Sequence, residues 1–411
     1  MRNETDIIPQ LFRKEFSKMV AVISKLFGLQ HIEIAEDIVS ETFLQATETW
    51  EQKGIPANPT AWLYAVAKQK TLYHFRRNKI LDQKVIPELK NTSATTDEIG
   101  EINFSMDNIK DSQLQMMFAV CSPAIASEAQ IALALRILCG FGIDEIAEAF
   151  LTNKETINKR LFRAKEKLRA EGISLEWPGD KEINNRLDNV LHIIYLLFNE
   201  GYYSTTQNQV LRKDLCLEAL RLGILLTEFN STNQPKTNGL IALMCFHSSR
   251  FDARQNDNAA PVLYEQQDES LWDKELISQG NYFLDASAEG KTISSYHLEA
   301  GIAYWHCQKE DTGEKWENIL DLYNKLLLIN YSPAVALNRT YALYKARGKK
   351  TALVEAEKLQ LTSNHFYFTL LGELYKDIDN KKAKESLQKA FSLAKTDTDK
   401  ATIQAKINDL S

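Results

Sequence analysis

Residues 127–169 read SEAQIALALRILCGFGIDEIAEAFLTNKETINKRLFRAKEKLR, and this stretch predicts three helices separated by two breaks. The inward positions expected on the first two helices are Ile131, Leu135, Leu138, Ile143, Ile146, Ala147 and Phe150. Gly140 and Gly142 end the first helix, because glycine weakens a helix and adopts turn conformations readily. Residues 151–153 form a tight turn, from which Thr152 or Asn153 can cap the third helix.

The third helix of this stretch has an apolar face and a basic face. Its apolar positions are Ile157, Leu161, Ala164 and Leu168, and its polar positions are Lys154, Asn158, Lys159, Arg163 and Lys167. Residues 154–169 hold seven Lys/Arg against two Glu. A short helix, a turn and a basic helix form the helix-turn-helix layout, whose second helix enters the major groove of DNA. A solvated basic surface helix is the alternative for this segment taken alone.

The same stretch resembles the domain of bacterial sigma factors that reads the upstream (−35) promoter element. Residues 128–130, 140, 145–147, 156–161, 163–165 and 168–169 carry the resemblance. It implies that the polar positions of the third helix, given above, contact DNA. Other regulators share the helix-turn-helix motif, so a second match upstream is needed to separate the two classes.

A second match lies at residues 35–46, AEDIVSETFLQA. This run resembles the helix by which extracytoplasmic-function (ECF) sigma factors dock on the clamp helices of the RNA polymerase β′ subunit. Asp37 and Glu41 lie one turn apart, beside apolar stripes at the helical period. The resemblance implies that Asp37, Ser40 and Glu41 contact polymerase. Ser40 departs from the glutamine usual in the family, so docking is expected to depend more on the two carboxylates.

Residues 58–79 resemble the family segment that opens and reads the downstream (−10) element. Pro59 suits the first turn of a helix, and basic residues follow with aromatic residues among them. Flat rings stack on unpaired bases while cations hold the nucleic-acid backbone. The residues expected to contact DNA are Lys68, Tyr73, His74, Arg76 and Arg77. Trp62 is interpreted as a core aromatic, whereas Tyr73 and His74 fit a core role and a DNA role equally well.

The composition sets the outer limits of the fold and of the partners. The chain has 411 residues, of which 44% are hydrophobic and 25% charged, so we expect more than one folded domain rich in helices. Residues 1–170 carry 22 basic and 22 acidic residues, and residues 171–411 carry 27 and 33. The net charge of −6 thus comes from the C-terminal part, so nucleic-acid binding is expected to be local.

The first 15 residues lack the apolar core of a signal peptide, which favours a cytoplasmic protein without a membrane span. Five widely spaced cysteines without a CxxC pair are typical of buried, reduced thiols. Cys245 with His247, and His297 with His306 and Cys307, match no common zinc spacing. We therefore expect neither a metal nor another cofactor.

The expected domain order is a polymerase-docking and −10 domain at residues 1–85, a linker at 86–112 and a helix-turn-helix domain at 113–175. A helical extension at 176–290 and helical repeats at 291–411 follow. Within the linker, residues 91–112 are polar and acidic and show no helical period, which predicts a flexible or extended segment.

The 240 residues after the helix-turn-helix resemble one ECF subgroup that has a long helical extension. Residues 195–202, 214–222 and 263–273 carry this resemblance. Glu200, Glu218, Asp268 and Asp273 are interpreted as buried polar anchors between helices, since no nucleophile or phosphate loop accompanies them. Small residues at Ala352 and Ala356 recur about 31 residues later at Ala383 and Ala390, which resembles tetratricopeptide (TPR) hairpins. A protein partner for these hairpins and an irregular helical domain without a ligand both remain open.

Together these resemblances imply an all-α, multidomain sigma factor of the ECF type, which is not an enzyme. It would bind core RNA polymerase through the β′ clamp helices and the β subunit, recognise promoter DNA, and be regulated in cis by its extension. The alternative is a helix-turn-helix regulator that binds DNA without polymerase and uses its tail as an interaction module. A helix for docking on polymerase distinguishes the two, because a plain regulator has no need of one.

Overall fold

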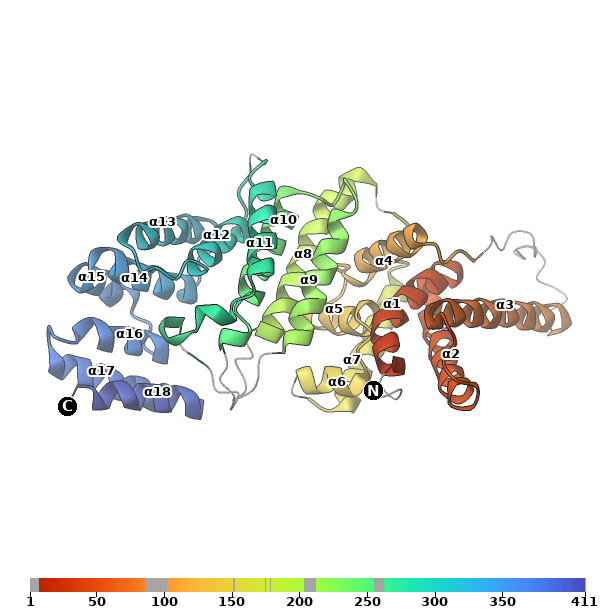
Figure 1. The fold of residues 1–411 in the computed structure, drawn as a ribbon, viewed down its shortest axis with the longest axis horizontal. Helices are drawn as coiled ribbons and strands as arrows, with labels where there is room; N and C mark the ends of the chain where they lie inside the picture. The colour runs from red at the N-terminus through yellow and green to blue at the C-terminus, as the bar shows by residue number, and fades with distance from the viewer. Residues whose placement is uncertain are drawn as a thin grey trace. The chain divides into compact units, whose positions relative to one another are not determined.

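The computed structural model describes residues 7–85, 102–150, 152–173, 175–177, 179–202, 212–254, 262, 264–290 and 292–410. These residues form helices and connecting turns, with no β-strand among them, as the all-α prediction requires. The chain divides into two compact units, Met1–Leu196 and Leu197–Ser411. Figure 1 shows the helices of each unit in chain order.

Three helices begin the N-terminal unit: α1 (Ile7–Phe27), α2 (Ile32–Lys53) and α3 (Pro59–Val85), with the short turn η2 (Leu29–His31) after α1. Phe16, Val39 and Leu63, one from each helix, are fully buried. The turns between the helices use glycine in the left-handed region, at Gly28 and Gly54 with φ of 80°. The apolar period of these segments thus closes a small three-helix core.

The expectation of a flexible or extended segment at residues 91–112 is wrong for its last part. Helix α4 (Met106–Val120) begins there, capped by the Ser105 hydroxyl, which accepts a hydrogen bond from the Asn108 N–H at 3.4 Å. Ile109 is buried with Ile102 and with Val22 of α1. Packing on α1 stabilises a helix that the local composition disfavours. Residues 86–101 lie outside the described part of the chain.

The helix-turn-helix stretch folds as α5 (Ser127–Leu133), a π-helical segment η3 (Ala134–Leu138), α6 (Ile143–Ala149) and α7 (Lys154–Ala170). Gly140 follows η3 with φ of 70°, which confirms the predicted break. Asn153 caps α7, since its side-chain oxygen accepts from the Thr156 N–H at 2.8 Å. The four apolar positions predicted for α7 are all buried. Leu151 of the predicted turn lies outside the described residues.

Helix α8 (Asp180–Tyr202) belongs to the N-terminal unit up to Leu196. The Arg186 side chain donates to the Phe118 carbonyl oxygen at 2.7 Å, and Asn189 Nδ2 donates to Gln130 Oε1 at 2.9 Å. These contacts tie α8 to α4 and α5. The boundary between the two units falls inside this helix, after Leu196.

The C-terminal unit continues with α9 (Lys213–Thr227), α10 (Pro235–Ser248), α11 (Lys274–Ser287) and α12 (Ser295–His306). Gly280 lets α11 approach α10 closely, because an added Cβ would lie 2.6 Å from the Phe246 ring. The interpretation of Asp268 and Asp273 as buried anchors is wrong: both are exposed, and they cap the short turn η6 (Glu269–Leu271) and helix α11. Asp268 accepts from the Ser270 N–H at 2.8 Å, and Asp273 from the Glu275 N–H at 2.9 Å. Their helix-starting role matches the preference of aspartate for caps.

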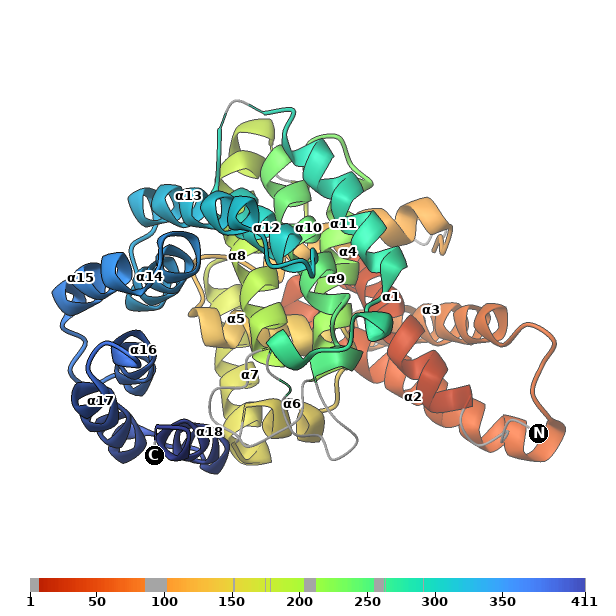
Figure 2. The same cartoon turned by 60° about the vertical axis from the view of Figure 1, so that its left-hand side comes forward.

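Six helices complete the unit: α13 (Gly313–Ile329), α14 (Pro333–Arg347), α15 (Lys349–Leu359), α16 (His365–Tyr375), α17 (Asn380–Leu393) and α18 (Asp397–Asn408). Successive helices pair along the chain, and the C-terminus lies beside the last pair (Figures 1 and 2). The small residues singled out in the sequence lie at the contacts, where Ala352, Ala356 and Ala383 are fully buried. An added Cβ at Gly372 would lie 2.6 Å from the Leu387 side chain, so only glycine permits this approach.

Candidate nucleic-acid interface

The predicted docking residues share one exposed face of α2. Asp37, Ser40 and Glu41 are all exposed, at the spacing that stacks side chains on consecutive turns. Leu44 extends this face by one turn and is 61% exposed. Sequence reasoning missed it, although its i+3 and i+4 spacing from Glu41 and Ser40 was visible. An exposed leucine beside two carboxylates suits a protein partner with basic and apolar groups.

The carboxylates of this face also interact with one another. Burial, followed by the negative charges of Glu36 and Glu41, raises the pKa of Asp37 above its usual value, against an opposing effect of Lys165. A cationic partner that approached this face would relieve the repulsion and lower that pKa again. The arrangement is therefore an acidic surface whose charge is stabilised by binding.

A groove joins the docking face to the predicted −10 face. Its cavity, of about 540 Å³, is lined from α2 by Asp37 and Glu41 and from α3 by Tyr73, His74 and Arg77. Lys70 bridges the two helices through an ion pair with Glu41, 3.3 Å from Nζ to Oε2. Two sets of residues that the sequence assigned to different partners thus line one groove.

The aromatic residues of α3 separate into packed and exposed rings. Tyr73 is 66% exposed and free to stack on a base, which favours the DNA role. The His74 ring is half-buried and meets Phe27 edge to face, with 5.4 Å between centroids, so it has a packing role as well. Trp62 packs against Trp50 at 5.4 Å, consistent with a core aromatic. Arg76 and Arg77 are exposed, whereas Lys68 is half-buried.

The outer face of α7 carries all the predicted −35 residues. Lys154, Asn158, Lys159, Arg163 and Lys167 are exposed. Lys154 pairs with Asp144 at 3.0 Å and Lys167 with Glu171 at 2.5 Å, and both pairs are solvent-exposed. Phe162, 63% exposed on the same helix, is a further candidate that the charge pattern did not reveal. A ring at this place suits contact with a thymine methyl group or a sugar.

The remaining cations of α7 serve a different purpose. Lys165 pairs with Glu36, which also receives Arg136 Nε at 2.9 Å, and Arg169 pairs with Glu33. Glu36 and Lys165 are largely buried, with side chains 8% and 13% exposed. On the other side of α1, Arg13 pairs with Glu145 of α6. We call these contacts between α1–α2 and η3–α7 the charged seam.

Two family models match the N-terminal unit of this chain. Residues 11–80 match Sigma-70 region 2, and residues 124–168 match Sigma-70, region 4. The two regions cover α2–α3 and the helix-turn-helix, so the fold and the site together define a sigma factor. Its role is promoter recognition by DNA-binding helices.

Beyond these regions, residues 186–288 match a family of unknown function, DUF6596. Uncharacterized protein R00370 of Rhizobium meliloti (strain 1021) is 32% identical over 388 residues, which cover 93% of this chain and 91% of that protein. The chain belongs to the sigma-70 factors of the ECF type, with a DUF6596 extension, and to the same family as that protein. Across the described residues, every helix is too short or too polar to cross a bilayer.

Proposed function

We propose that this sigma factor docks on core RNA polymerase through the exposed face of α2, reads the −10 element with α3 and reads the −35 element with α7. It would act in the cytoplasm, by recognition and not by catalysis. The docking proposal rests on Asp37, Ser40 and Glu41, which share an exposed face with Leu44. A helix-turn-helix regulator that binds DNA without polymerase has no need of such a docking face.

The division of the α7 cations is the observation that carries the promoter-reading proposal. Lys165 and Arg169 are used in the charged seam, whereas Lys159 and Arg163 are exposed and form no ion pair with any described residue. Unpaired cations one turn apart can neutralise phosphates or donate to guanine without first breaking an internal pair. The basic face is therefore available to DNA while the apolar face holds the domain together.

The charged seam must open for both elements to be read together. The elements are centred about 25 base pairs apart, roughly 85 Å at 3.4 Å per pair. Helix α7 has 17 residues, a length of about 25 Å, and its last turns contact α2, which lines one groove with Tyr73. The two reading faces are therefore too close to span the promoter while Lys165 remains on Glu36.

We further propose that the C-terminal extension regulates the factor in cis. The extension is acidic, with 27 basic against 33 acidic residues after residue 170, whereas the reading faces are basic. A large helical unit in the same chain supplies a high local concentration of regulator without a separate protein. A protein partner bound to the helical repeats is a second way by which the extension could act.

Run-off transcription with purified core polymerase tests the function. Promoter fragments bound in vivo should yield transcripts with the full chain, and D37K/E41K should abolish polymerase capture while the helical circular dichroism is retained. Asp111→Lys, at an exposed acid of α4 outside the docking face, is the control. Undiminished capture by folded D37K/E41K would refute the docking assignment, and DNA binding without transcription would favour the plain regulator.

The cis proposal requires a truncation that respects the fold. A cut after residue 202 keeps α8, whose Arg186 and Asn189 bond to α4 and to α5. We expect promoter-specific transcription to differ from that of the full chain at equal amounts of folded protein. Equal activity over a range of salt and temperature would show that the extension does not control this step.

A further inference from the structure

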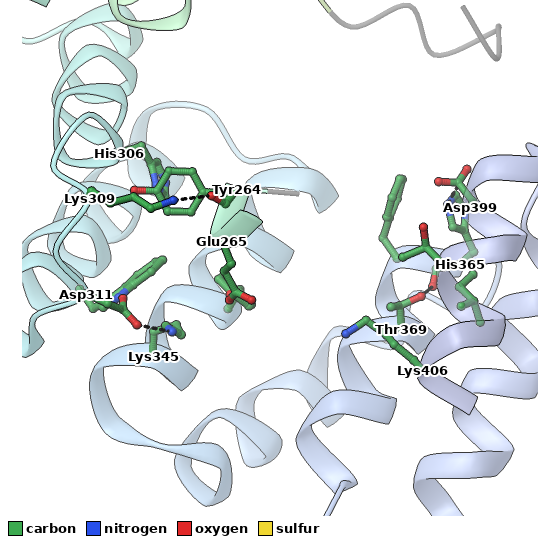
Figure 3. A pocket seen from close by; sticks show the side chains of 15 residues that line it. Tyr264, Glu265, His306, Lys309, Asp311, Lys345, His365, Thr369, Asp399 and Lys406 are labelled. Atoms are coloured by element: carbon green, nitrogen blue, oxygen red, sulfur yellow. Dashed lines mark hydrogen bonds and ion pairs between the residues drawn. The ribbon is translucent and has the colours of Figure 1, made fainter. Parts of the chain in front are cut away.

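A cavity of about 860 Å³ lies in the C-terminal unit. Figure 3 shows its two walls: Tyr264, His306, Lys309 and Lys345 on one side, and His365 with neighbouring side chains of α16 and α18 on the other. Its volume lies within the range of small-molecule sites. Aromatic rings alternate with charged groups along it, which is typical of sites that bind and orient an organic ligand.

Three cations surround one aromatic ring at this cavity. The charged groups of Arg250, Lys309 and Lys315 lie 5.5, 5.3 and 5.2 Å from the centroid of the Tyr264 ring. A fourth cation, Lys345, lies 5.3 Å from the Trp316 ring. Such contacts are individually favourable, but cations held close together repel one another in a partly buried place.

The three cations around Tyr264 form no ion pair with a carboxylate among the described residues. Lys309 Nζ donates to the backbone oxygens of Tyr264 and Gln267 at 3.1 and 2.8 Å. Lys315 Nζ donates to the Tyr264 hydroxyl at 2.9 Å and to the Gln308 carbonyl oxygen. The buried positive charge is thus held by neutral oxygens.

The acids of the cavity are already paired with other groups. Asp311 pairs with Lys345 at 2.6 Å and accepts from the Trp316 indole, while Asp399 lies 3.5 Å from the His365 ring. Glu265 accepts from the Tyr341 hydroxyl at 3.4 Å. None of the three neutralises the cations around Tyr264 by direct contact.

Buried polar atoms without partners lie at the same place. His306 Nδ1 and Arg250 Nε are closed to solvent and form no hydrogen bond in the described structure. Burial, and then the charges of Arg250 and Lys315, lower the pKa of His306 to about 3, so its ring is neutral near pH 7. Arg250 Nε is a donor without an acceptor, and its place beside an excess of positive charge indicates that an acceptor is missing.

We propose that this cavity binds a small aromatic carboxylate, with the carboxylate toward Lys309 and Lys345 and the aromatic body between Tyr264, Trp316 and Phe366. The carboxylate supplies negative charge beside a group of cations of which Lys345 alone has a carboxylate partner among the described residues. The flat body matches the rings, which bury apolar area and favour offset stacking. The extension then carries a ligand site of its own, beyond its proposed part in transcription.

Isothermal titration calorimetry on the full-length chain tests the proposal. The probes are benzoate, 2-naphthoate and indole-3-acetate, with 2-naphthamide as the uncharged counterpart of 2-naphthoate. At least one carboxylate should bind, and naphthamide should bind at least about tenfold more weakly than naphthoate, as expected when a charge-assisted hydrogen bond is lost. Absence of binding by all three acids up to about 10 mM, or equal binding of the amide, would overturn the proposal.

Two variants locate the site. Lys309→Met and, separately, Lys345→Met should each weaken carboxylate binding by about tenfold, since each removes one positive charge. Lys325→Met is the matched control, because Lys325 is 55% exposed on α13 and pairs with Asp321 outside the cavity. Circular dichroism checks that the variants are folded. Unchanged affinity in a folded Lys309→Met or Lys345→Met protein, or an equal loss in Lys325→Met, would place the anion elsewhere and overturn the assignment.

Discussion

The charged seam of the N-terminal unit and the paired helices α13–α18 of the C-terminal unit, here called the helical stack, are held together by different forces. In the seam, Glu36 receives both Arg136 and Lys165, and the three side chains are 8%, 18% and 13% exposed. In the stack, Leu374 and Ala383 are fully buried, and Gly372 admits the Leu387 side chain at contact distance. The ion pairs of the stack are peripheral, as in Arg347–Glu317, with side chains 56% and 47% exposed.

The difference shows which interface is suited to exchange partners. Desolvation offsets much of the gain from a buried ion pair, and other charges can replace either member of the pair. In the proposed function, cationic groups of polymerase would replace Lys165 and Arg169 on the acids of α2, and water would solvate the freed cations. An apolar contact has no such substitute in water, because its separation exposes area that no polar partner stabilises. The opening of the seam that we propose would therefore leave the stack closed.

Glu36→Gln should produce the largest effect. The substitution keeps the shape but leaves Arg136 and Lys165 without their buried carboxylate, which costs about 4 kcal/mol in unfolding free energy. Hydrogen exchange monitored by mass spectrometry should show faster exchange in α2 and α7 and unchanged exchange in α14–α17. Glu48→Gln, an exposed acid on the same helix, is the control. Equal protection in Glu36→Gln would mean that the seam does not depend on charge.

Leu374→Ala should destabilise the stack by about 3 kcal/mol, from lost apolar contact and the cavity left behind. Leu374 is fully buried in α16, and the matched control Val354→Ala changes a side chain that is 57% exposed. Urea unfolding followed through hydrogen exchange in α14–α17 measures the loss. The loss in Leu374→Ala should be the same at low and high salt, because an apolar contact has no charge for salt ions to screen. A strong salt dependence at Leu374 would remove the contrast between the interfaces.

Acid should lower the unfolding free energy of the C-terminal unit through the protonation of His306. The folded pKa of His306 is about 3, against an ordinary value of about 6.5, so the unfolded chain binds the extra proton first. The stability that depends on a neutral His306 is complete above about pH 6.5 and is lost as pH falls toward 3. The loss reaches about 2 kcal/mol at pH 5.

His306→Gln tests this linkage, since glutamine keeps polar atoms but does not titrate in this range. The slope of the unfolding free energy against pH reports how many more protons the unfolded chain binds than the folded chain. Near pH 5 this number should be smaller by about one in the variant, and the difference should fade toward pH 7. His31→Gln is the control, because His31 is exposed. An unchanged slope in His306→Gln would show that the ring is already charged, or solvated, in the folded protein.

The smallest effect is expected at the exposed cations of α7. Lys159→Ala and Arg163→Ala should each weaken promoter binding by about 1 kcal/mol, roughly fivefold, without changing stability. Lys165→Ala should leave promoter binding unchanged but reduce the protection of α2 against hydrogen exchange. Fluorescence anisotropy on promoter fragments measures the affinity for DNA. If Lys159→Ala and Arg163→Ala leave binding unchanged and Lys165→Ala reduces it directly, the roles of the two faces are exchanged.

The sequence alone determined the elements whose apolar residues repeat at the helical period. In α7 the four predicted apolar positions are buried and the five predicted DNA residues are exposed. The break at Gly140 and the Asn153 cap were also readable, because both depend on the local chemistry of one or two residues. The same holds for the exposed Asp37, Ser40 and Glu41, which follow from the side-chain order on α2.

Only the tertiary structure decided what depends on residues far apart in the chain. In the sequence, Glu36 is one more acid beside Asp37. In the structure it is buried at the centre of the seam, because it pairs with Arg136 and Lys165, which lie 100 and 129 residues away in the chain. Helix α4 begins in a polar run because Ile102 and Ile109 pack with α1. The cations around Tyr264 come from three separate segments. Periodicity reports which side of a helix is buried, but the identity of the opposing group is set by the packing of distant segments.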